Sequence, residues 1–126
     1  MRQVVLDAPL LLSWFVPDGD GRELRREYEA GTLTIVAPRS LPADLLALVA
    51  RGGGSSPDLL AAAAEQLDRL GFDLRQPTAG SLAPWIALGL GADRAAYPAL
   101  AASLDVRLAT NDPELARIAA PLLVER

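Results

Sequence analysis

The chain has 126 residues and a mass of 13.3 kDa, enough for one domain with one buried core. It contains no cysteine and no histidine, which excludes disulfides, thiol nucleophiles, cysteine zinc sites and imidazole bases. All 12 basic residues are arginine and the net charge is −4, so mechanisms that need a lysine are excluded, and nucleic-acid binding by surface charge alone is disfavoured.

Hydrophobic residues make up 51% of the chain, but no apolar run approaches the roughly 20 residues that a transmembrane helix needs. The N-terminus has no basic segment followed by a long apolar stretch and a small-residue cleavage site. We therefore expect one cytoplasmic domain that spans residues 1–126 and has no contact with a membrane.

Apolar runs alternate with helix-forming segments along the chain. In chain order, the pattern predicts a strand at 2–6, helices at 8–15 and 22–30, a strand at 33–37, a helix at 43–51, a flexible linker at 52–56, a helix at 58–70, a strand at 72–75, helices at 81–90 and 93–104, the second interrupted by Pro98, a strand at 106–109, a helix at 112–119 and a possible last strand at 122–124. This order predicts a three-layer α/β/α fold around a central parallel sheet of four to five strands.

Two aspartates follow predicted strands near opposite ends of the chain. Asp7 comes directly after the strand 2–6, and Asp112 follows the strand 106–109. Because the carboxyl ends of parallel strands open on one edge of a sheet, we expect the two carboxylates to lie within roughly 10 Å of each other. Oxygen ligands of this kind suit Mg²⁺ or Mn²⁺ better than zinc or copper. The alternative interpretation is that both aspartates only cap the helices they precede, without binding a metal.

The chain resembles the PIN domain family over nearly its whole length. The resemblance is carried by VVLDA at 4–8, WFVP at 14–17, VAP at 36–38 and LATND at 108–112. It is closest to the short members that act as toxin ribonucleases in toxin-antitoxin pairs. The resemblance implies a Mg²⁺- or Mn²⁺-dependent endoribonuclease that cuts single-stranded RNA, with Asp7, Asp44 and Asp112 as metal ligands and catalytic residues. Asp44 stands where the family usually has glutamate.

The family's third acid is missing from this chain. The family carries it in a Tyr-Asp pair at a helix start, where this chain has Tyr97 and Pro98, and an ungapped count back from the motif at 110–112 puts Arg94 there instead. Asp93 is adjacent and is a further candidate ligand, although one step along a helix turns a side chain by about 100°. Asp93 pointing into the cluster would favour an enzyme, whereas Arg94 or Pro98 in that space would favour a degenerate, inactive domain that binds or scaffolds.

The helices at 42–51 and 81–90 carry apolar residues on more than one face. We therefore expect a two-fold homodimer that pairs through these helices, with a small antitoxin as a candidate partner that places a basic side chain in the acidic pocket. The competing interpretation is that both helices are buried within the monomer.

Overall fold

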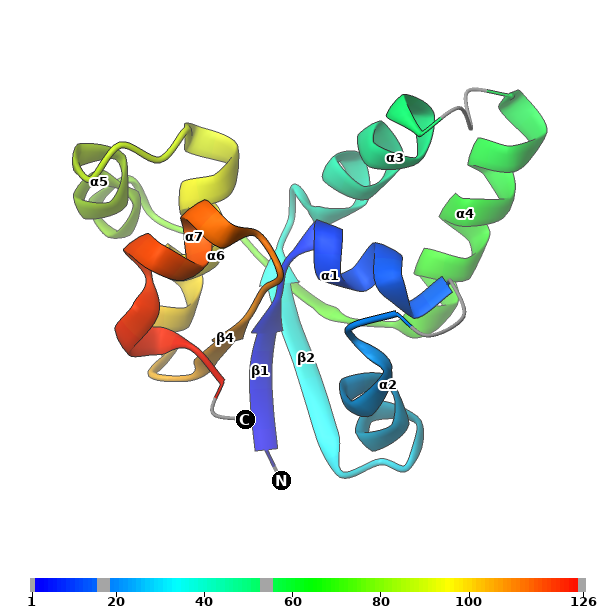
Figure 1. Ribbon diagram of the computed structural model, residues 1–126, viewed down its shortest axis with the longest axis horizontal. Helices are drawn as coiled ribbons and strands as arrows, with labels where there is room; N and C mark the ends of the chain where they lie inside the picture. Colours follow the sequence, from blue (N-terminus) through cyan, green and yellow to red (C-terminus); the bar gives the residue numbers. More distant parts are fainter. Residues whose placement is uncertain (1, 16–18, 53–55, 125–126) are drawn as a thin grey trace.

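The computed structural model describes residues 2–15, 19–52 and 56–124. Its centre is a sheet of four strands in the order β3-β2-β1-β4, all parallel (Figure 1). The three-layer α/β/α architecture predicted from the sequence is confirmed. The strands are β1 (Arg2–Leu6), β2 (Leu33–Pro38), β3 (Asp73–Arg75) and β4 (Arg107–Ala109).

Seven α-helices connect the described parts of these strands. They are α1 (Ala8–Leu12), α2 (Arg22–Glu29), α3 (Leu41–Arg51), α4 (Pro57–Leu70), α5 (Ala79–Ala87), α6 (Ala92–Leu104) and α7 (Pro113–Ile118), with short 3₁₀ turns at Ser13–Phe15 and Ala120–Leu122. The predicted linker at 52–56 falls mainly on residues outside the described part. No helix within the described ranges is long and apolar enough to cross a membrane.

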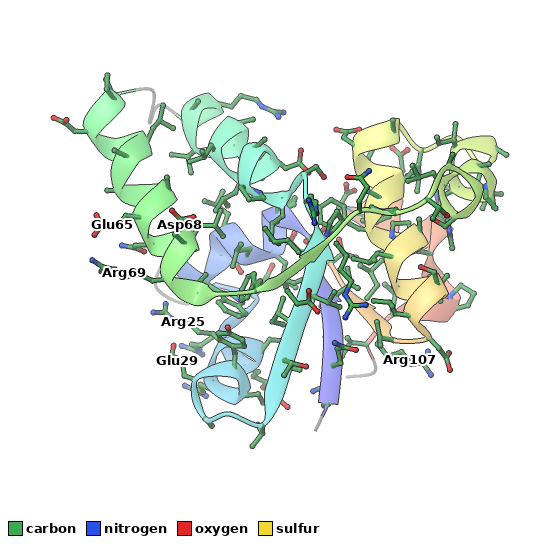
Figure 2. All side chains as sticks on the ribbon, turned by 180° about the vertical axis from the view of Figure 1, so that it is seen from behind. Arg25, Glu29, Glu65, Asp68, Arg69 and Arg107 are labelled. Atoms are coloured by element: carbon green, nitrogen blue, oxygen red, sulfur yellow. The ribbon has the colours of Figure 1, made fainter. Side chains whose placement is uncertain are left out.

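β1 is one of the two inner strands of the sheet, and its apolar side chains lie in the core. Val4, Val5 and Leu6 are fully buried, because β1 has a strand on each side and helices above and below. Helix α2 packs on one face of the sheet, and α6 packs on the opposite face against β1, β2 and β4 (Figures 1 and 2). Helix α3 packs against α1 and α4, while α5 packs against α6.

Two predicted elements differ from the structure. Helix α6 runs through Pro98 instead of being interrupted there. Pro98 is buried against the sheet, so tertiary packing outweighs the hydrogen bond that a proline cannot donate to the carbonyl of Arg94. The predicted strand at 122–124 is reduced to a single bridge between Leu108 and Leu123, because the 3₁₀ turn before it leaves few residues to pair with β4.

Candidate functional site

Asp7 ends β1 and begins α1. It is 2% exposed, and its Oδ1 accepts a hydrogen bond of 3.0 Å from the backbone N–H of Leu10, which makes Asp7 the N-cap of α1. Its Oδ2 accepts a second hydrogen bond from the hydroxyl of Thr110, at the end of β4. Both carboxylate oxygens of Asp7 are therefore engaged within the protein.

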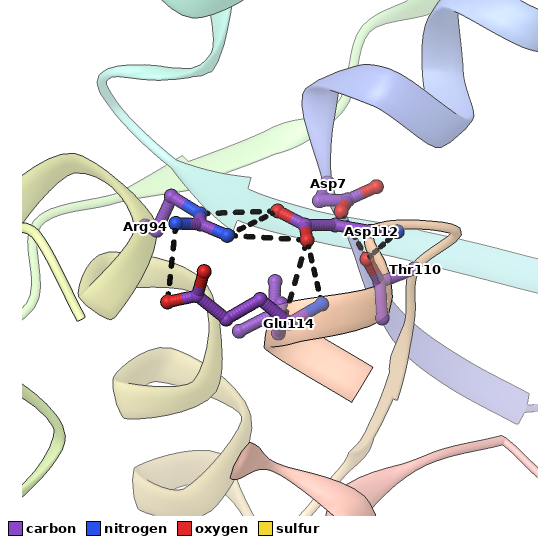
Figure 3. A network of polar contacts seen from close by, with 6 residues as sticks. Asp7, Arg94, Thr110, Asp112 and Glu114 are labelled. Carbon is purple, nitrogen blue, oxygen red and sulfur yellow. Dashed lines mark hydrogen bonds and ion pairs between the residues drawn. The ribbon is translucent and has the colours of Figure 1, made fainter. Parts of the chain in front are cut away.

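Asp112 occupies the corresponding place after β4. Its Oδ1 accepts hydrogen bonds from the backbone N–H groups of Glu114 and Leu115, so Asp112 is the N-cap of α7. Its own N–H donates to the hydroxyl oxygen of Thr110 at 3.0 Å. Thr110 thus bridges Asp7 and Asp112, and the two acids lie together at the carboxyl edge, as the parallel-sheet argument predicts (Figure 3).

The guanidinium of Arg94 lies against Asp112. Its Nε donates to Asp112 Oδ2 at 3.0 Å, and its Nη2 donates to Oδ2 at 2.8 Å and to Oδ1 at 3.1 Å (Figure 3). Nη1 lies 3.5 Å from Glu114 Oε1. The Arg94 and Asp112 side chains are 35% and 20% exposed, so water reaches the pair only in part. A bidentate pair of this kind is the strongest geometry for arginine and carboxylate, and hydrogen bonding to Asp112 raises the pKa of Arg94.

The other two predicted acids have different surroundings. Asp44, in the first turn of α3, accepts a hydrogen bond of 2.7 Å from the hydroxyl of Tyr97 on α6. Burial and this bond raise the pKa of Tyr97. Asp93 is exposed at the start of α6. The next residue, Arg94, contacts Asp112, and the role of Asp93 as a ligand stays a prediction.

The charge of Asp7 is poorly solvated. Burial is the main cause that raises its pKa from 3.8 to about 6; the hydrogen bonds from Thr110 and Leu10 lower the pKa, and the charge of Asp112 raises it. A buried carboxylate with such a pKa is a feature of functional sites as well as of strained cores.

The residues at this edge do not fit a divalent cation in the arrangement the structure shows. Within residues 2–15, 19–52 and 56–124, no group of three or more acidic side chains is placed to hold a metal ion. Arg94 takes both oxygens of Asp112, and a positive charge at this distance opposes a second cation. The sequence places Arg94 at the position of the missing acid, but residue spacing predicts neither its ion pair with Asp112 nor the hydrogen bond between Tyr97 and Asp44.

Comparison with known proteins supports the fold alone. The chain is similar to PAE2754 from Pyrobaculum aerophilum, known from a crystal structure, with a TM-score of 0.67 and 18% sequence identity. The match covers 93% of this chain and 86% of that chain. No family model and no curated protein matches the sequence.

Proposed function

We propose that this chain is a PIN-like domain in which an internal ion pair has replaced the metal centre, and that it acts by binding a partner protein instead of cutting RNA. The observation that carries the proposal is the bidentate contact of Arg94 with Asp112. The arginine supplies the positive charge that the carboxylate of Asp112 needs, so this carboxylate is paired without a metal cation.

The competing proposal is the metal-dependent endoribonuclease, the toxin of a toxin-antitoxin pair, that the family resemblance implies. It is favoured by the convergence of Asp7 and Asp112 and by the raised pKa of Asp7. In that case Asp7, Asp44 and Asp112 would hold Mg²⁺ or Mn²⁺, and single-stranded RNA would be the substrate. Arg94 would first have to leave Asp112.

One experiment separates these two functions. We expect the melting temperature of the wild-type protein to stay the same in millimolar Mn²⁺, because a protein without a specific site gains no stability from the ion by mass action. Likewise, single-stranded RNA should be cleaved no faster in Mn²⁺ than in EDTA. A rise in melting temperature together with Mn²⁺-dependent cleavage, both absent from Asp112→Asn, would establish the nuclease.

We also propose a homodimer that pairs through α5. This helix has no buried residue; Ile86 within it is 46% exposed, and Leu88, its C-cap, is 60% exposed. Helix α3 fits the monomer interpretation better, since it packs between α1 and α4 and buries Leu41 and Leu45. Light scattering at micromolar concentration should give twice 13.3 kDa, and Leu88→Glu should halve that mass because a charge in an apolar interface stays unpaired. A monodisperse wild-type monomer would rule out the dimer.

A further inference from the structure

A groove of about 760 Å³ lies on the face of the sheet that α2 covers, away from α6. We call it the α2 groove. One wall is α2 and the residues before it, and the other is the segment after α7 (Figure 1). Its inner end reaches Thr110, the residue that joins Asp7 to Asp112. Its lining includes the acidic residues Asp20 and Glu23 and the apolar residues Leu24, Leu108, Leu123 and Val124.

Both walls of the α2 groove are fixed to the sheet. On one side, the guanidinium of Arg2 in β1 forms an ion pair of 2.9 Å with Glu27 of α2. On the other side, the N–H of Val124 donates to the carbonyl of Leu108 at 3.0 Å, and the guanidinium of Arg107 donates to the carbonyl of Pro121 at 2.9 Å. The groove is therefore part of the fold and does not depend on a loosely held chain end.

The α2 groove combines an apolar lining with unpaired negative charge. Leu24, Leu123 and Val124 are only partly buried. Asp20 and Glu23 are exposed on the rim, and neither has an ion pair with any residue in the described ranges. The lining carries the carboxylates of Asp20, Glu23 and Glu27 against the guanidinium groups of Arg2 and Arg22, so its net charge is −1. Arg2 is paired with Glu27.

We propose that the α2 groove binds a short segment of a partner protein that has apolar side chains flanked by arginine or lysine. This inference rests on the proposed binding function and specifies the chemistry of the partner. The apolar side chains would cover Leu24, Leu123 and Val124, and the cations would pair with Asp20 and Glu23.

The same features disfavour other occupants. Unpaired carboxylates on the rim repel the phosphates of RNA and of lipid headgroups. A second copy of this chain docked by its α5 face brings no cation, since residues 76–92 contain no charged side chain. A basic, apolar peptide remains as the occupant that satisfies both the lining and the rim.

The probe is a fluorescein-labelled ten-residue peptide in which leucine and arginine alternate, titrated with the full chain and followed by fluorescence anisotropy. Two matched peptides replace arginine by glutamate or leucine by serine. We expect the leucine-arginine peptide to bind, and both replacements to weaken binding at least tenfold. Asp20→Asn combined with Glu23→Gln should raise the Kd three- to tenfold, because exposed ion pairs are partly screened by salt.

The control variant is Glu65→Gln combined with Asp68→Asn on α4, which makes the same change in net charge away from the groove (Figure 2). It should leave the Kd unchanged. Failure of the leucine-arginine peptide to bind, or equal weakening by both double variants, would overturn the proposal. So would binding of a fluorescein-labelled single-stranded RNA oligonucleotide to the protein when no peptide is present. Mn²⁺-dependent RNA cleavage would overturn the proposed function and leave this titration unaffected.

Discussion

The variant Arg94→Asp should bind Mn²⁺ where the wild-type protein does not. The substitution removes the guanidinium from Asp112 and adds a carboxylate beside Asp7 and Asp112, so three acids then share one edge of the sheet. Without metal the variant should be less stable by about 1–3 kcal/mol, since an ion pair is lost and like charges are brought together. At a Mn²⁺ concentration a hundred times the Kd, it should regain about 2.7 kcal/mol, or roughly 10 °C in melting temperature.

The control for this gain of metal binding is Arg94→Ala. It also breaks the contact with Asp112 but adds no carboxylate, so it should lose stability and gain little from Mn²⁺. Isothermal titration calorimetry and thermal melts measure both properties. If the wild-type protein, Arg94→Ala and Arg94→Asp all respond equally to Mn²⁺, Arg94 does not block the site, and the nuclease proposal gains support. If Arg94→Asp neither binds Mn²⁺ nor gains stability from it, the carboxylates at this edge are not arranged as metal ligands.

Replacing Asp7 by asparagine should stabilise the protein at neutral pH. The folded state raises the pKa of Asp7 from 3.8 to about 6, chiefly by burial, so folding disfavours its charged form. Below pH 3.8 the carboxyl is neutral in both states and there is no penalty. As the pH rises from 3.8 to 6, the unfolded chain loses its proton first, and stability falls by about 3 kcal/mol in total.

Asparagine still offers an oxygen to the N–H of Leu10, and it is as good an N-cap as aspartate. We therefore expect Asp7→Asn to raise the free energy of unfolding at pH 7 by about 1–3 kcal/mol and to remove this part of the pH dependence. Urea unfolding between pH 3.5 and 7.5 measures both effects. Asp58→Asn, the same change at an exposed position in the first turn of α4, should leave the slope intact. If the free energy of unfolding of Asp7→Asn changes with pH as much as that of the wild-type protein, Asp7 is not the cause of the pH dependence.

The strand and helix order was predictable from the sequence because local patterns determine it. Apolar runs that end at Asp7 or Pro38 read as buried parallel strands, and the aspartate before Pro113 reads as a helix N-cap. The course of α6 through Pro98 was not predictable in this way. It depends on the sheet surface that α6 covers, which no window of local sequence contains.

The candidate site was predictable only in part, for a related reason. The parallel topology brings Asp7 and Asp112 to one edge, and that step needs only the order of the strands. The partners of these acids depend on side-chain reach between α6 and neighbouring elements. Side-chain packing decides whether Arg94 contacts Asp112 or solvent, and whether Tyr97 contacts Asp44. The spacing of residues in the sequence does not specify this packing.

The position of β1 between β2 and β4 also affects how the chain folds during synthesis. β1 is made early, but β4, which pairs with Val4, Val5 and Leu6, begins only at Arg107. At about 5–20 residues per second, the ribosome needs on the order of 5–20 s to supply that partner. During this interval one of the two inner strands of the sheet has an open edge that can pair with other chains. We therefore expect slower synthesis, or added chaperones, to reduce aggregation of newly made chains.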